Sequence, residues 1–111
     1  MGRNQPLDLL PGTLDLLILR ALQRGRLHGY SIMQAIRDRS DEVLEVGESS
    51  LYPALQRLLL NGWVTAEWGA SENNRRARFY TLTPSGRKQL SSERADLERM
   101  MAAIQKVLQT A

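Results

Sequence analysis

The residues best suited to chemistry are polar side chains between residues 49 and 57. Serine and tyrosine hydroxyls can bind phosphate oxygens, whereas glutamine and arginine can form hydrogen bonds with base edges. Leu51, Leu55 and Leu58 recur at helical spacing, which places residues 53, 56 and 57 on the opposite side of one helix. This pattern favours a nucleic-acid contact over a polar helix face that is merely solvated. The polar set comprises Ser49, Ser50, Tyr52, Pro53, Gln56 and Arg57.

A second polar cluster lies between residues 73 and 78, in a basic stretch of the chain. The 111 residues carry a net charge of +3, but residues 52–88 alone hold six basic and two acidic side chains. Guanidinium groups suit phosphates and the narrow minor groove, so this distribution indicates a polyanionic partner. A basic surface that is only solvated is the alternative. The predicted DNA-binding residues here are Asn74, Arg75, Arg76 and Arg78.

Catalytic and metal chemistry find little support in the sequence. The chain has one histidine, His28, and no cysteine. A lone histidine cannot build a usual metal site, and no nucleophile with a base or Gly-rich phosphate loop accompanies it. We therefore expect a structural role for His28 at the start of a helix. The sequence predicts no enzyme activity, no catalytic residue, no metal site and no cofactor.

The elements that position these residues follow from the spacing of apolar side chains. Thr13 is expected to cap the first helix, and either Ser49 or Ser50 the third. Leu60 is expected to point away from the core. The predicted helices cover residues 13–24, 30–39 and 49–60, with a loop over residues 41–48.

The hydrophobic period changes after residue 62. Residues 63–68 and 77–83 are rich in β-branched and aromatic side chains, which predicts a β-hairpin with a polar tip. Thr83 as N-cap and Pro84 at the first helical position predict a final helix to about residue 109. The fold class is thus mainly α with a small β-hairpin. We expect a winged helix-turn-helix domain over residues 1–83, in which the third helix enters the major groove and the hairpin forms a wing.

The final helix, residues 84–111, is predicted to be a dimerisation helix. A helix of about 25 residues spans nearly 40 Å, which is more than a winged domain needs. Its apolar stripe could fold back on its own core, but the far end is better buried against a second copy of the chain. The predicted interface residues are Leu97, Met100, Met101, Ile104, Val107 and Leu108.

Four segments of the chain together resemble the PadR family of bacterial transcriptional regulators. The most specific are His28-Gly29-Tyr30 and the run from Ser50 to Leu58, Ser-Leu-Tyr-Pro-Ala-Leu-Gln-Arg-Leu. The others are residues 14–19, Leu-Asp-Leu-Leu-Ile-Leu, and residues 79–83, Phe-Tyr-Thr-Leu-Thr, followed by Gly86. The length is similar to that of the short PadR subgroup, which has a single C-terminal helix.

The resemblance implies a homodimer that binds palindromic operator DNA and usually represses transcription. It also implies a small hydrophobic or aromatic effector that releases the DNA. Met33, Met100 and Met101 could adapt to such a ligand, although simple filling of the core is an equal alternative. Two departures stand out: the acidic residue often found near Leu60 is missing, and the final helix has no tryptophan for stacking a planar ligand.

Two other functions compete with DNA binding. A winged helix can act as a protein-interaction module, but the basic hairpin argues against this. A ligand-binding or enzyme-like protein with a dimer cavity is the other, and nothing in the sequence supports catalysis. No apolar run approaches a membrane span and no signal peptide is apparent, so we expect a cytoplasmic protein with no membrane partner.

Overall fold

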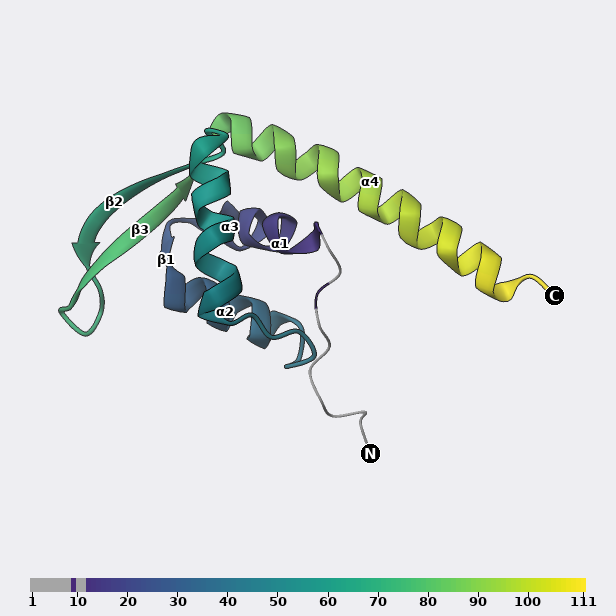
Figure 1. Ribbon diagram of the computed structural model, residues 1–111, viewed down its shortest axis with the longest axis horizontal. Coiled ribbons are helices and arrows are strands. Elements are labelled where there is room, and N and C mark those ends of the chain that lie inside the picture. Colours follow the sequence, from purple (N-terminus) through teal and green to yellow (C-terminus); the bar gives the residue numbers. More distant parts are fainter. Residues whose placement is uncertain (1–8, 10–11) are drawn as a thin grey trace.

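The computed structural model describes residue 9 and residues 12–111 of the chain. Within these residues the fold is mainly helical with a small antiparallel sheet, which confirms the predicted fold class (Figure 1). The order is α1 (Thr13–Ala21), the 3-10 turn η2 (Leu22–Arg24), β1 (Leu27–His28), α2 (Gly29–Arg39), α3 (Glu48–Leu60), β2 (Val64–Ala70), β3 (Arg76–Leu82) and α4 (Pro84–Gln109).

The sheet places its strands in the order β1-β3-β2. Strands β2 and β3 pair from Val64 opposite Leu82 to Ala70 opposite Arg76, and with residues 71–75 they form the wing. Strand β1 pairs Leu27 with Tyr80 along the other edge of β3. Sequence reasoning missed β1, because two residues are too short to show an alternating pattern.

The core lies where α1, α2 and α3 meet the base of the wing. The leucines predicted to face it from α3 are buried, and Leu60 points away with 81% of its surface exposed, as expected. The first turns of α4 add Leu90 to this core. The largest fully buried side chains are Ile18, Leu19, Leu22, Ile32, Leu51, Leu55, Leu58 and Val64.

Two predicted helix caps are wrong, the first by one residue and the second by two or three residues. Helix α1 begins at Thr13 itself, and the cap is Gly12 in the left-handed conformation, with no capping side chain. Helix α3 begins at Glu48 after the extended Gly47, so Ser49 and Ser50 lie in its first turn and do not cap it. Glycine tolerates an N-cap position, and an acidic residue in the first turn favours the earlier start through the helix dipole.

The start of α4 matches its prediction. The Thr83 side chain accepts a hydrogen bond from the Gly86 amide at 3.0 Å, and Pro84 occupies the first turn. The Thr83 hydroxyl also donates to the Gly62 carbonyl at 2.7 Å. A Cβ atom at Gly86 would overlap the carbonyl oxygen of Trp63. The glycine therefore lets α4 leave the domain directly against the start of β2, which sets the direction of the helix.

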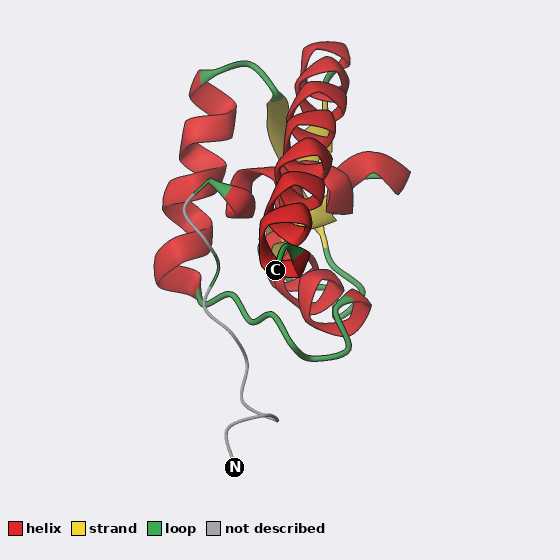
Figure 2. Cartoon of the chain, turned by 90° about the vertical axis from the view of Figure 1, so that its right-hand side faces the viewer, coloured by secondary structure: helices red, strands yellow, loops and turns green. Residues whose placement is uncertain are grey.

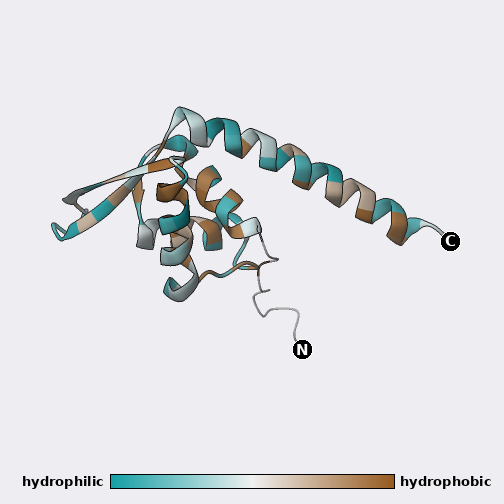
Figure 3. Cartoon of the chain, turned by 45° about the horizontal axis from the view of Figure 1, so that its top comes forward, coloured by the Kyte–Doolittle hydropathy of each residue, from teal (hydrophilic) through white to brown (hydrophobic). Residues whose placement is uncertain are grey.

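Helix α4 carries the chain away from the wing. The sheet and the C-terminal end of α4 lie at opposite ends of the molecule (Figure 1), and in Figure 2 helix α4 lies in front of the strands. Apolar segments recur along α4 up to its last turns (Figure 3). Within the described part of the chain, no helix is both long enough and apolar enough to cross a membrane.

Candidate nucleic-acid interface

The outer face of α3 exposes every predicted DNA-binding side chain of that helix. Ser49, Ser50, Tyr52, Pro53, Gln56 and Arg57 are all exposed. Helical spacing puts Ser49 and Gln56 near the middle of this face, with Tyr52 toward one edge and Arg57 toward the other. Leu60 lies one turn beyond Gln56 on the same face. The arrangement offers hydrogen-bonding groups along one ridge, ending in an apolar side chain.

Arg57 has a partner that the sequence did not reveal. Its Nη2 atom donates to the Asp15 Oδ1 atom of α1 at 2.8 Å. The Asp15 side chain is 21% exposed and that of Arg57 is 55% exposed, so the pair is partly shielded from solvent. The guanidinium is therefore anchored to α1, and part of its hydrogen-bonding capacity is already used. That Arg57 contacts DNA stays a prediction.

A carboxyl group of α4 lies in the same corner of the domain. The Oε2 atom of Glu93 is buried and has no hydrogen-bond partner among the described residues. Burial raises the pKa of Glu93, a hydrogen bond with Gln89 opposes that shift, and the carboxylates of Asp15 and Asp96 raise it further. The Glu93 carboxyl of α4 therefore lies close enough to Asp15, the α1 partner of Arg57, for the two acidic groups to interact.

Tyr52 joins the two most specific sequence motifs. A Cβ atom at Gly29 would lie 2.6 Å from the Tyr52 hydroxyl, so glycine at the start of α2 makes room for this ring. Burial raises the pKa of Tyr52, and Glu48 and Tyr80 add to the shift. A phenol is protonated at neutral pH even without this shift, so Tyr52 can donate a hydrogen bond to an anionic oxygen.

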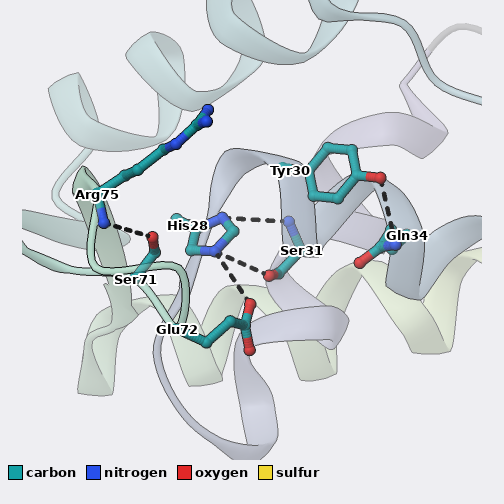
Figure 4. A network of polar contacts seen from close by, with 7 residues as sticks. All are labelled: His28, Tyr30, Ser31, Gln34, Ser71, Glu72 and Arg75. Carbon is teal, nitrogen blue, oxygen red and sulfur yellow. Dashed lines mark hydrogen bonds and ion pairs between the residues drawn. The ribbon is translucent and has the colours of Figure 1, made fainter.

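His28 caps α2, which confirms its expected structural role. Its Nδ1 atom accepts a hydrogen bond from the Ser31 amide at 3.3 Å, and its ring meets the edge of Phe79 with centroids 5.4 Å apart. Its Nε2 atom also lies 3.9 Å from the Oε1 atom of Glu72 (Figure 4). Since Glu72 belongs to the wing tip, this contact places the tip beside the start of α2.

The wing tip presents the second predicted cluster. Asn74 adopts a left-handed conformation with φ of 57°, which asparagine tolerates well, and this lets the chain turn between the strands. Arg75, Arg76 and Arg78 are all exposed. The Arg76 guanidinium lies 4.6 Å from the centre of the Trp68 ring, so Arg76 is stacked on a neighbouring strand.

A groove of about 780 Å³ separates the wing from the starts of α2 and α3. It brings Tyr52 together with the wing arginines, but the other predicted residues of α3 do not line it. Sequence reasoning missed the exposed aromatic residues Tyr30 and Trp68, whose only signal was apolar side chains at solvent-facing positions. The groove lining includes Tyr30, Tyr52, Trp68, Arg75, Arg76 and Arg78.

The apolar stripe of α4 divides into two parts. Leu97 is partly buried against the core of its own domain, and so is Met33 of α2. Met100, Met101, Ile104, Val107 and Leu108 are exposed. The stripe therefore begins inside the domain at Leu90 and continues beyond it without a partner among the described residues. Among the described residues, no three His, Cys, Asp or Glu side chains gather in a way that could hold a metal ion.

Comparison with known proteins agrees with this geometry. A family model described as "Transcriptional regulator PadR-like family" matches residues 18–92. A solved transcriptional regulator from Clostridium thermocellum is 34% identical, with a TM-score of 0.78, over 86% of this chain and 92% of that one. Bacillus subtilis PadR in complex with operator DNA is 28% identical, with a TM-score of 0.65, over 73% of this chain and 46% of that one.

Curated relatives point the same way. An uncharacterised protein from Lysinibacillus sphaericus is 31% identical over 84 residues, which are 76% of this chain and 77% of that protein. The negative transcriptional regulator PadR of Bacillus subtilis is 30% identical over 73 residues. That match covers 66% of this chain but only 40% of the longer regulator.

Proposed function

This chain belongs to the PadR-like family of DNA-binding transcriptional regulators, and on that premise we propose that it represses transcription as a homodimer on a palindromic operator. The observation that carries the proposal is the joint exposure of the outer face of α3 and the arginines of the wing. The name of the Bacillus subtilis relative, a negative regulator, supports repression over activation.

In this proposal α3 of each subunit lies in the major groove. Ser49, Ser50 and Tyr52 bind phosphates near the start of the helix, where backbone amides also face the DNA. Gln56 and Arg57 reach base edges in the major groove. Pro53 packs between these two side chains and the wall of the major groove. The wing, through Asn74 and its arginines, contacts the flanking backbone and minor groove.

Dimerisation through α4 would set the spacing of the two recognition helices. Two helices of this kind must lie about 34 Å apart to enter successive major grooves on one side of the duplex. The exposed part of the apolar stripe gives two copies of α4 a surface to share. A two-fold arrangement of that kind matches a palindromic site, because each half-site meets an identical subunit.

Selection of bound sequences from random DNA should yield a two-fold symmetric site, and α3 variants should then identify the base readers. Gln56→Ala and Arg57→Ala should each cost on the order of 1–3 kcal/mol and relax specificity at one position. Affinities are measured by titration of a labelled operator against the wild-type protein.

Asp15→Asn is the matched variant for Arg57, because it removes the partner on α1 and leaves the guanidinium in place. If Arg57 reads a base, Asp15→Asn should retain most of the affinity that Arg57→Ala loses. Equal losses in both variants would assign Arg57 to holding α3 on α1. Wild-type affinity in Arg57→Ala would remove it from the interface altogether.

A small hydrophobic or aromatic effector, bound between paired α4 helices, would release the operator. The exposed Met100 and Met101 support this part of the proposal, because flexible thioether side chains adapt to varied ligands. In this proposal the dimer has two conformations that differ in subunit spacing, and only one of them spans both half-sites. The ligand can shift the equilibrium between them only by as much as its affinities for the two conformations differ. Planar aromatic compounds should bind the dimer, measured by tryptophan quenching, and lower its operator affinity. Binders that leave operator affinity unchanged would exclude the effector role.

A further inference from the structure

We propose that the groove between α3 and the wing clamps the sugar–phosphate backbone of one DNA strand, with Trp68 packed on a deoxyribose and Arg76 bound to the adjacent phosphate. The inference rests on the proposed operator binding and deepens it. The arginines of the wing are predicted to contribute to DNA affinity through electrostatic contacts with phosphates. The clamp adds an apolar contact between Trp68 and a deoxyribose.

The position of Trp68 follows from the strand register. Side chains alternate along β2, so Trp68 shares a face with Val64 and Ala66, which turn toward the domain. Val64 is buried and Ala66 is half-buried, but Trp68 lies farther out and is 60% exposed. Its cross-strand partner is Arg78. The indole therefore lies on the inner face of the wing, at the edge of the groove that Tyr52 lines from α3.

The Arg76 guanidinium lies over this indole, and stacking leaves its donors available. Guanidinium N–H groups point outward in the plane of the group, so a guanidinium that lies over a ring can still donate from its edge. An exposed contact of this kind contributes little to stability. Stacking instead restricts the side chain, so less rotamer entropy is lost when Arg76 binds a phosphate.

The groove lining fits a DNA backbone in both charge and shape. Three arginines and two exposed tyrosines line it, and the carboxylate in the lining is Glu72. A nucleic-acid backbone alternates anionic phosphates with largely apolar sugars, and this lining contains both guanidinium groups and aromatic rings. Duplex DNA is favoured over a single strand, because Arg76 already covers one face of the indole on which a free base would stack.

The chain allows a direct optical test, because it contains two tryptophans. In Trp63→Phe the remaining emission comes from Trp68. Binding of a duplex operator should shift that emission and reduce its quenching by acrylamide severalfold, whereas a single strand of the same sequence should leave it unchanged. Unchanged Trp68 emission in a variant that binds the duplex would overturn the inference, and so would an equal response to the single strand.

Measurements of DNA affinity provide a second test of the proposed clamp. Trp68→Ala should weaken duplex binding about tenfold, with Trp68→Phe retaining most of the affinity. Its salt slope should change by no more than about two units for the dimer, the share of one phosphate contact per subunit. Thr65→Ala is the matched control, since Thr65 is exposed on the opposite face of β2.

The failures of the two proposals are distinguishable. If the wild-type chain binds no duplex, operator binding fails and this inference falls with it. If the wild type binds and Trp68→Ala binds equally well while remaining folded by circular dichroism, only the clamp is excluded.

Discussion

Replacing Ile104 and Leu108 with glutamate is expected to turn the protein into a monomer and to weaken operator binding about 100- to 10,000-fold, the usual gain from linking two binding events. Both side chains are exposed on the stripe that continues from Leu90 beyond the domain. A glutamate pair would place charges where a second α4 must bury apolar surface. Light scattering measures the mass, and titration with full and half operators measures the affinity.

The variant is chosen so that the domain itself stays intact. Deleting the helix after Gln89 would also remove Leu90, which is buried in the core, and would confuse unfolding with dissociation. Ala95→Glu together with Ala102→Glu adds the same charge to exposed positions on the other side of α4 and should leave the dimer unchanged. A dimer that persists in the Ile104 and Leu108 variant would place the interface elsewhere, with α1 and the N-terminal segment as the next surface to test.

Neutralising Arg75, Arg76 and Arg78 with glutamine is expected to weaken binding to specific and random duplexes by a similar factor, on the order of 1,000-fold. The reason is that phosphate contacts do not depend on sequence and draw their free energy from counterion release. The slope of log affinity against log salt should fall by roughly one unit per lost contact, and so by as much as about six units for a dimer.

The charge-matched control is the triple substitution of Arg94, Arg99 and Lys106 by glutamine, which removes the same charge from exposed positions on α4. It should leave the slope close to that of the wild type. A wing variant with an unchanged slope would mean that its arginines do not touch phosphates. A loss confined to the specific operator would instead assign them to reading bases.

The sequence by itself determined the elements and the side chains that they expose. The leucine spacing of α3, the turn-rich tip between two β-rich runs, and the Thr83-Pro84 start of α4 are all local signals. Each depends on hydrogen bonds or periodicity within a few residues, so neighbours along the chain suffice to predict it. For the same reason the outer face of α3 and the wing arginines could be named in advance.

Helix starts were the weakest of the local predictions. Ser49 and Ser50 have side chains that often cap helices, and the neighbouring residues gave no reason to exclude either of them as the N-cap of α3. The backbone instead begins the helix at Glu48. A cap contributes about 1 kcal/mol, so small differences in packing and in the dipole are enough to move a helix start by a residue or two.

Only the tertiary structure decided which distant groups meet. The pair between Arg57 and Asp15 joins residues 42 positions apart, and it gives the guanidinium of α3 a carboxylate partner on α1 that the sequence did not reveal. The contact of Tyr52 with Gly29 and the stacking of Arg76 on Trp68 arise in the same way. Such contacts depend on how helices and strands pack in three dimensions, which no local spacing encodes. The residues of the last two contacts line the groove between α3 and the wing.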